Sequence, residues 1–171
     1  AYFLEIAEDY DKVCLAAYFL EMAEYYGIEN SDESQRLLLL YQTLRALASD
    51  KFSPRLLRII YEIRTMGING EYPDVFSCAA CGRKEGLAYF HMGRRAVICS
   101  DCQPVEGGRP ISASALYAFQ FILSAPMKKL FSFRLTDPVE EEVWQLLREY
   151  QGRYLEHSFK AEAFLSSPGK G

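Results

Sequence analysis

The sequence contains none of the short motifs that mark common enzyme families. There is no glycine-rich phosphate-binding loop, no HExxH motif and no nucleophile elbow among its 171 residues. Only two histidines are present, His91 and His157, and neither is placed with an evident nucleophile. We therefore expect a protein that is not an enzyme.

Long apolar runs and a basic excess are also missing. The longest apolar stretches, around Leu37 to Tyr41 and Cys14 to Leu20, are far shorter than the roughly 20 residues that cross a bilayer. We expect no membrane association and a cytoplasmic location. The formal net charge of −4 disfavours binding of nucleic acid by bulk electrostatic attraction. Half of the residues are apolar, which favours a folded domain with a buried core.

Four of the five cysteines form the pattern Cys78-x2-Cys81-x17-Cys99-x2-Cys102. Two close thiolate pairs at this separation fit one tetrahedral zinc ion, and Gly82 can adopt the backbone conformation that the first turn often needs. Four thiolates fill all four positions on the ion, whereas a catalytic zinc keeps one position for water. We predict a structural Zn²⁺ site.

Other uses of the cysteines fit less well. Two disulfides would suit a small secreted protein, but we recognise no signal-peptide pattern, and Cys14 would be left over. A redox site needs only one Cys-x-x-Cys pair beside a βαβ unit. His91 lies between the pairs and could replace a ligand, but with four cysteines available we interpret it as a surface residue of a hairpin.

Apolar residues at intervals of three and four predict several helices. The first covers residues 1–26, with an apolar stripe facing the core and acidic residues outside; the stripe consists of Phe3, Ile6, Tyr10, Val13, Ala17, Leu20 and Ala23. A second helix starts near Asp32 or Ser34 and ends at Ala48. The others are expected from a Ser53 cap to Gly67, from a Ser112 cap to Ser124, and from Thr136 or Asp137 to about Tyr154, the last with Glu140 completing a capping box.

Two short strands are predicted within the cysteine region. Leu87 to His91 and Arg95 to Ile98 would form a hairpin around Met92-Gly93-Arg94. The predicted fold class is mainly α, a helical bundle-like domain with an inserted four-cysteine, zinc-ribbon-like β-hairpin. We divide it into a helical region (1–75), a zinc-binding module (76–104) and a helical region that completes the same domain (105–171). Since the metal replaces a core in so small a module, chelation should unfold the module first.

Charge is distributed unevenly along the chain. Residues 1–35 contain one basic and nine acidic residues, whereas residues 36–64 contain six basic and two acidic ones, an excess of four positive charges. Such a surface prefers an acidic partner, either phosphate or carboxylate. Five of these basic residues are candidates for the contact: Arg45, Lys51, Arg55, Arg58 and Arg64. The alternative is that they are ordinary solvated helix charges.

The order of features along the chain resembles a known family. The segments that carry the resemblance are Tyr10-Asp11-Lys12 with Ala17 to Glu21, Leu56 to Glu62, Met66-Gly67-Ile68, Cys78 to Gly82, Ile98 to Cys102, Gly108 to Ser112, Tyr154-Leu155-Glu156 and Lys160 to Leu165. Over almost the whole chain this set resembles the bacterial recombination mediator RecO. It is similar to the C-terminal part, an α-helical domain with an inserted zinc module, without the family's N-terminal OB-fold.

The resemblance implies a non-enzymatic role in DNA repair and recombination. A RecO-like protein would displace or remodel single-strand DNA-binding protein, anneal strands and, with RecR, help RecA to load. DNA would be bound mainly through the absent N-terminal OB-fold. The helical domain would dock the acidic, hydrophobic-ended tail of single-strand DNA-binding protein, with Arg55 and Arg58 at the centre of the site and Arg45, Lys51 or Arg64 in support.

A function of a different class stays open on the residues alone. Zinc ribbons also serve transcription and translation factors as nucleic-acid contacts, and Arg83, Lys84, Arg94 and Arg95 place positive charge near the cysteine pairs. Tight, salt-sensitive binding of DNA or RNA by this chain would favour that function. Weak binding would favour docking of a protein partner.

Overall fold

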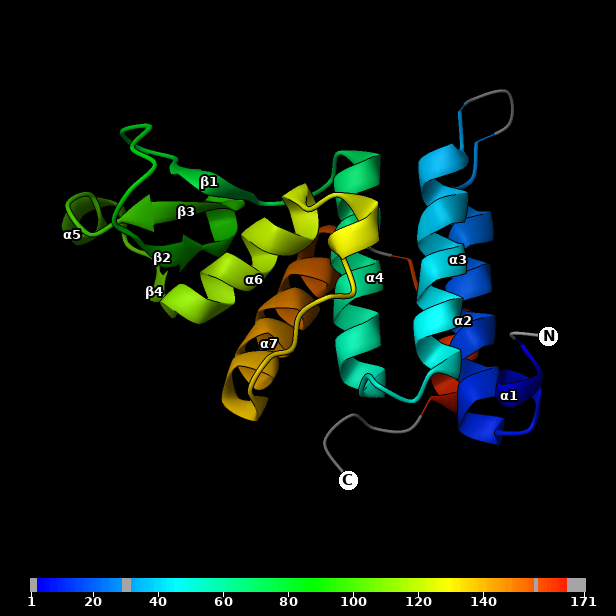
Figure 1. Cartoon of the computed structure of the whole chain (residues 1–171). Helices are drawn as coiled ribbons and strands as arrows, with labels where there is room; N and C mark the ends of the chain where they lie inside the picture. The colour runs from blue at the N-terminus through cyan, green and yellow to red at the C-terminus, as the bar shows by residue number, and fades with distance from the viewer. Residues whose placement is uncertain (1–2, 29–31, 156, 166–171) are drawn as a thin grey trace.

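The computed structural model describes residues 3–28, 32–155 and 157–165. This part of the chain contains seven α-helices, a small sheet of four strands and three short 3₁₀ turns (Figure 1). In chain order they are α1 (Leu4–Ala7), α2 (Tyr10–Tyr26), α3 (Ser34–Ala48), α4 (Pro54–Asn69), β1 (Asp74–Cys78), β2 (Leu87–His91), η1 (Met92–Arg94), β3 (Ala96–Cys99), α5 (Gln103–Glu106), β4 (Arg109–Pro110), α6 (Ala113–Ser124), η2 (Met127–Lys129), α7 (Asp137–Tyr154) and η3 (Lys160–Phe164). The predicted fold class, mainly α with an inserted four-cysteine hairpin, is confirmed.

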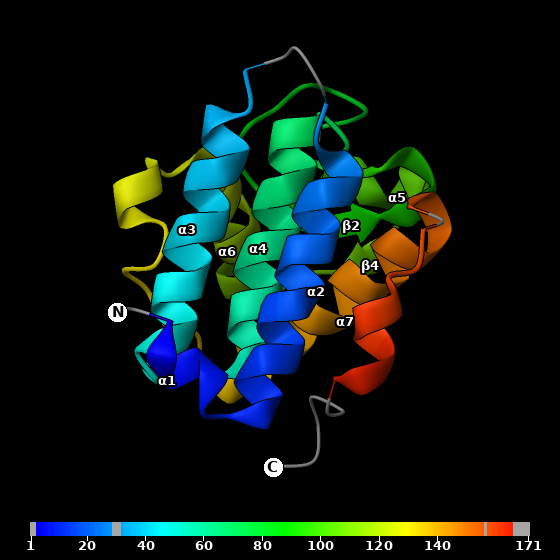
Figure 2. The ribbon, with the colours of Figure 1, turned by 90° about the vertical axis from the view of Figure 1, so that its right-hand side faces the viewer.

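Helix α4 lies at the centre of the fold. Helices α2 and α3 pack on one side of it and α6 and α7 on the other, with the sheet and α5 beyond them (Figures 1 and 2). Residues on every side of α4 are buried, among them Leu57, Ile59, Ile60 and Ile63. The buried residues of α4 also include the charged Arg58 and Glu62, so the helix is enclosed by its neighbours on its polar side as well. No helix in the described ranges is both long and apolar enough to span a membrane.

The predicted single helix over residues 1–26 is wrong, because the helix is interrupted between Ala7 and Tyr10. The Asp9 carboxylate accepts hydrogen bonds from the backbone N–H of Asp11 (2.9 Å) and Lys12 (3.3 Å), which makes Asp9 the N-cap of α2. A short aspartate side chain offers the backbone this alternative to a continuous helix. Residues 1 and 2 of the predicted helix lie outside the described ranges.

The predicted inward face is wrong over α2, although Ile6 of the same stripe is buried. Tyr10, Val13 and Leu20 are exposed, with Tyr10 at 70% of its full accessibility. The buried side of α2 instead includes Leu15, Tyr18, Phe19 and Met22. This second set has the same helical spacing and more aromatic bulk, and burying it removes more apolar area from water. Two stripes with one period cannot be separated by spacing alone.

The prediction that Gly67 ends the α4 helix is wrong. The helix continues to Asn69 and stops at Gly70, whose φ of 72° is left-handed and favours glycine. Gly67 has a packing role, since a Cβ at this position would lie 3.1 Å from Cδ2 of Leu123 in α6. The missing side chain lets the two helices approach closely.

Two of the predicted helix caps are confirmed and a third differs. Ser53 Oγ accepts from the N–H of Leu56 and Ser112 Oγ from the N–H of Ala115. In α7, Thr136 occupies the N-cap position without a side-chain hydrogen bond to the helix. Glu140 does not complete the predicted capping box, because its carboxylate reaches Ser53 and Arg55 of the α4 region instead.

The sheet extends the predicted hairpin by a strand on each side. Strands β2 and β3 pair antiparallel, with Phe90 opposite Val97 and His91 opposite Ala96, as the hairpin prediction requires. Strand β1 pairs parallel with β3, and the short β4 pairs antiparallel with β2, which gives the order β1-β3-β2-β4. These outer pairings join segments that have no local turn signal between them.

One side of the sheet belongs to the main hydrophobic core. Val75, Phe90, Val97 and Ile111 are buried in the same cluster as the helix side chains. Cys78, Ile98 and Cys99 form a separate, much smaller cluster at the cysteine end. The sheet therefore does not stand alone on the metal site, since it shares the helical core.

Arg95 fastens the hairpin turn to α7. Its φ of 52° is left-handed, and its guanidinium lies over the rings of Tyr154 (4.6 Å) and Tyr150 (5.5 Å) while Nε donates to Tyr150 Oη (3.0 Å). The hydroxyl of Tyr154 donates to the carbonyl of Met92 in the same turn (2.6 Å). Cation–π contacts and hydrogen bonds thus hold the sheet against the last two turns of α7.

Candidate metal centre and arginine cluster

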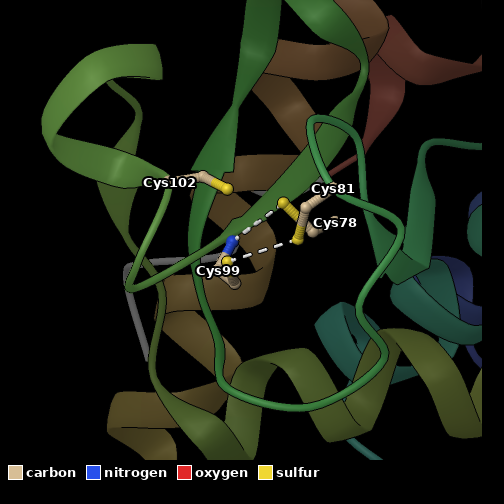
Figure 3. Close-up of side chains that lie close together, drawn as sticks. All are labelled: Cys78, Cys81, Cys99 and Cys102. Atoms are coloured by element: carbon tan, nitrogen blue, oxygen red, sulfur yellow. Dashed lines mark hydrogen bonds between the residues drawn. The ribbon is translucent and has the colours of Figure 1, made fainter.

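The four paired cysteines converge at one end of the sheet (Figure 3). Cys78 ends β1, Cys81 lies in the turn after it, Cys99 ends β3 and Cys102 precedes α5. Their sulfur atoms all lie within 4.8 Å of one another. The two sequence pairs are therefore one cluster.

Tight turns hold each pair of sulfurs in place. The N–H of Gly82 donates to the carbonyl of Cys78 (2.8 Å), and the φ of Gly82 is 78°, in line with the prediction that this turn needs glycine. In the second pair the N–H of Cys102 donates to the carbonyl of Cys99 (3.2 Å). We call these two turns the knuckles.

The sulfur spacing suits a tetrahedral ion. Cys81 Sγ and Cys99 Sγ are 3.8 Å apart, far beyond the roughly 2.05 Å of a disulfide bond. Metal–sulfur bonds of about 2.3 Å in a tetrahedron place two sulfurs about 3.8 Å apart. The donor set and its spacing therefore fit a thiolate-preferring cation. His91 is not part of this cluster, because its Nδ1 accepts from the N–H of Arg94 (3.1 Å) and caps η1.

The environment of the thiols differs within the cluster. Burial acts to raise the pKa of Cys78, but backbone N–H groups, with that of Cys99 at 3.3 Å the strongest, outweigh it and lower this pKa to about 6. The pKa of Cys102 is raised to about 12 by hydrogen bonding to Cys99, burial and its other thiol neighbours. The Cys78 thiolate forms readily, and a cation that binds the cluster displaces the remaining thiol protons into solvent, which makes binding pH-dependent.

The five predicted partner-binding residues lie in two different environments. Arg45, in the last turn of α3, and Lys51, between α3 and α4, are exposed. Arg55, Arg58 and Arg64 instead lie in helix interfaces, where other groups already contact them. They do not form one exposed basic face, because their contact partners come from distant parts of the chain that a local charge count does not include.

Arg55 and Arg64 each join α4 to another helix. Nε of Arg55 lies 2.8 Å from Glu140 in the first turn of α7, and Nη1 contacts Glu141. Burial acts to lower the pKa of Arg55, and these carboxylates raise it overall. Nη1 of Arg64 donates to carbonyls at the end of α6, including that of Ala125 (2.8 Å). A cation at a helix C-terminus is favourable, although burial lowers the pKa of Arg64.

Arg58 is buried between two aromatic rings. Its guanidinium carbon lies 4.7 Å from the ring centre of Tyr18 and 4.9 Å from that of Trp144. Nη2 is 3.0 Å from Glu162 and 3.6 Å from Glu62. Burial acts to lower the pKa of Arg58, but Glu62 and the other partners raise it overall. Arg58 therefore stays charged in an apolar setting.

Comparison with known proteins identifies the family. Residues 7–163 match the family model described as Recombination protein O C terminal. The chain belongs to this family. The resemblance to RecO that the sequence motifs indicate is thereby confirmed.

Several relatives of this RecO-family chain carry the name DNA repair protein RecO. The protein from Thermoanaerobacter sp. is 24% identical over 163 residues, which cover 95% of this chain and 66% of the relative. That from Acetivibrio thermocellus is 28% identical over 167 residues (96% and 66%), and that from Streptomyces griseus 32% identical over 120 residues (70% and 48%). The chain thus spans just under two thirds of the length of the first two relatives.

Three charged residues of this RecO-family chain, Glu62, Arg148 and Glu162, form contacts that the sequence reasoning missed. Arg148 of α7 lies 2.6 Å from Glu62 and 3.7 Å from Glu162, with its guanidinium over the ring of Trp144. Tyr18 Oη donates to Glu62 Oε1 (2.7 Å), and burial together with Glu62 raises the pKa of Tyr18. We call Tyr18, Arg58, Glu62, Trp144, Arg148 and Glu162 the arginine cluster. Only the four-residue spacing of Arg58 and Glu62 is visible locally, so sequence alone offered no signal for Glu162.

Proposed function

We propose that this chain is the C-terminal, partner-docking domain of a non-enzymatic DNA repair mediator of the RecO family. It would dock the tail of single-strand DNA-binding protein and, with RecR, support strand annealing and RecA loading in the cytoplasm. The family match over residues 7–163 is the observation that carries this proposal. Binding of DNA would depend mainly on the N-terminal OB-fold that the resemblance implies. The division into regions 1–75, 76–104 and 105–171 belongs to the same proposal.

Cys78, Cys81, Cys99 and Cys102 are proposed as the ligands of a structural Zn²⁺ ion. The support is four thiol donors within 4.8 Å, of which Cys78 and Cys99 are buried. When bound, zinc would supply a four-way cross-link between the knuckles, with no position left for a water nucleophile. Gly82 and the backbone N–H groups around Cys78 position the first pair whatever cation is held.

The tail would meet two kinds of basic residue. Arg45 and Lys51 face solvent and suit the tail's carboxylates. Arg58, between two rings, suits a carboxylate next to an aromatic group. Arg55 and Arg64 would contribute by holding α4 against α7 and α6.

The alternative, nucleic-acid binding by the zinc module, has less support. Arg83 lies 2.5 Å from Asp101, and Arg94 2.6 Å from Glu106. Arg95 is turned back onto Tyr150 and Tyr154 of α7. Of the four basic residues near the knuckles, three already have partners within the described residues.

Titration with a labelled acidic C-terminal peptide of single-strand DNA-binding protein tests the proposal. Lys51→Glu should weaken binding, while Lys84→Glu, an exposed lysine beside a knuckle with the same change of charge, should not. Short single-stranded DNA is titrated in parallel. Peptide binding unaffected by Lys51→Glu would contradict the proposed basic contact. DNA binding that Lys84→Glu removes would move the function to the zinc module.

A further inference from the structure

The last described segment of the chain lies as a strap along α2. This strap, Phe159 to Leu165, includes η3 and runs beside α2 in Figure 2, where it is orange to red. The Glu21 carboxylate of α2 accepts hydrogen bonds from the N–H groups of Lys160 (2.8 Å) and Ala161 (2.9 Å). These two bonds fix the start of η3, and they lower the pKa of Glu21.

Phe159 of the strap enters an aromatic recess. Its ring meets Tyr18 edge-on at 5.8 Å and Tyr25 edge-on at 5.6 Å, with Tyr26 and His157 also around it. Only 7% of Phe159 is exposed. Edge-to-face rings at these separations are favourable contacts.

Glu162 of the strap supplies a carboxylate three residues later. Its Oε1 lies 3.0 Å from Nη2 of Arg58 and 3.7 Å from Nη1 of Arg148. Without Glu162, the two guanidinium groups would face a single carboxylate, that of Glu62. The charge balance of the recess therefore requires an anion at this position.

The strap fills this recess incompletely. A half-open pocket of about 210 Å³ remains between the strap, α2, α4 and α7, with Met22, Tyr26, Gln151 and Leu155 in its walls. An enclosed apolar cavity of about 150 Å³ accepts benzene, and this pocket is larger, open to solvent and lined by both polar and apolar groups. The space left beside Phe159 and Glu162 can thus take further ligand atoms.

Polar atoms beside the pocket lack partners. Glu62 is 1% exposed, and its Oε1 accepts from Tyr18 and Arg148. Its Oε2 has no hydrogen-bond partner among the described residues, and the same holds for Nε of Arg148, which also lines this space. A buried polar atom without a partner is unfavourable, so a ligand that reaches these atoms gains hydrogen bonds that the strap does not make.

We propose that the recess beneath the strap is a peptide-binding site for an aromatic side chain within a few residues of a carboxylate. The strap is its internal occupant, and a partner peptide of this chemistry displaces it. The identification of that partner as the acidic, hydrophobic-ended tail rests on the proposed function, whereas the existence of the recess does not. Docking is then regulated by how firmly the strap is held, because the open fraction of the site scales the apparent affinity.

The first test uses the full chain and a labelled peptide with the sequence of residues 157–165. Phe159→Ala with Glu162→Gln releases the strap by removing both groups that enter the recess. This double variant should bind the peptide at least about tenfold more tightly than the unmodified chain. A peptide carrying Gln in place of Glu162 should lose most of this affinity.

A matched control separates strap release from a general effect. Glu24→Gln with Phe164→Ala makes the same chemical changes at two positions outside the recess and should bind like the unmodified chain. Glu162→Gln alone, at a side chain 39% exposed, is a milder variant if the double variant loses helicity, and it should show a smaller gain. Equal affinity in the release variants and the control would overturn the proposal.

The acidic tail peptide of single-strand DNA-binding protein is titrated in parallel with the same variants. If the strap peptide binds the released chain and the tail does not, the recess is supported as a peptide-binding site and the tail is excluded as its partner. If the tail binds all variants equally, docking of the tail to this chain is supported, and the proposal that the tail displaces the strap is overturned. A dimer that disappears in the double variant would assign the recess to the strap of a second copy, which also overturns it.

Discussion

Removal of the metal should release the knuckles while the rest of the sheet stays folded. Cys81→Ser is the cleanest perturbation, because Cys81 is exposed and its loss leaves no cavity in the core. It removes one of the four proposed ligands, and treatment of the unmodified chain with a strong chelator should have the same effect.

The size of the effect follows from which side chains are buried where. Val75, Phe90, Val97 and Ile111 join the sheet to the helical core, and each is at most 5% exposed. At about 1.5–3 kcal/mol per buried side chain, they contribute about 6–12 kcal/mol that does not depend on the metal. The cluster at the knuckles contains a single large aliphatic side chain, Ile98, worth about 1.5–3 kcal/mol, against about 10–16 kcal/mol for structural zinc.

Hydrogen exchange resolves the two parts of the sheet. The N–H of Gly82 and of Cys102, which close the knuckles, should lose protection without metal. The N–H of Asp74, bonded to the carbonyl of Arg95, and that of Ile111, bonded to Ala88, should keep it. Loss of protection at Asp74 and Ile111 together with the knuckles would refute the reasoning and show that the whole sheet depends on the metal.

Three further predictions concern the helical part. Gly67→Ala should lower the free energy of unfolding by about 1–2 kcal/mol, because the added Cβ would crowd Cδ2 of Leu123 in α6. Gly152→Ala should raise it by about 0.5–1 kcal/mol, because a Cβ there has no neighbouring atom within 4 Å. Urea unfolding of the two variants measures both changes. Glu62→Ala should cost about 3–5 kcal/mol because it leaves buried guanidinium groups underpaired, and a loss under about 1 kcal/mol in the same assay would contradict the arginine cluster as described. The lowered pKa of Glu21 means that its contribution is complete above the ordinary glutamate pKa and is lost as pH falls through the lowered value; near-UV circular dichroism of the tyrosines should change between about pH 5 and 3, and less so in Glu21→Gln.

Local signals predicted the local features well. Ser53 and Ser112 cap their helices because a hydroxyl reaches an N–H three residues away, a relation that the sequence displays directly. The knuckles follow for the same reason, since Gly82 and the Cys-x-x-Cys spacing determine each turn within about five residues. The cysteine cluster is an assembly of two such local turns.

Other features depended on contacts between distant residues. Arg58 looked like a surface charge because Trp144 and Glu162, which enclose it, follow it by 86 and 104 residues. Gly67 looked like a helix stop because the side chain that fills its space, Leu123, belongs to another helix. In α2 two apolar stripes competed, and the packing of α3, α4 and η3 against the helix decided between them.

Helix α7 has two unlike neighbours on roughly opposite sides. Tyr150 and Tyr154 receive Arg95 from the hairpin turn, whereas Arg148 takes part in the arginine cluster under the strap. Residues 148 and 150 differ by about 200° around the helix axis, and the helix is about 10 Å across. Because both the hairpin turn and the strap contact α7, a small rotation of this helix about its own axis would displace both sets of contacts together.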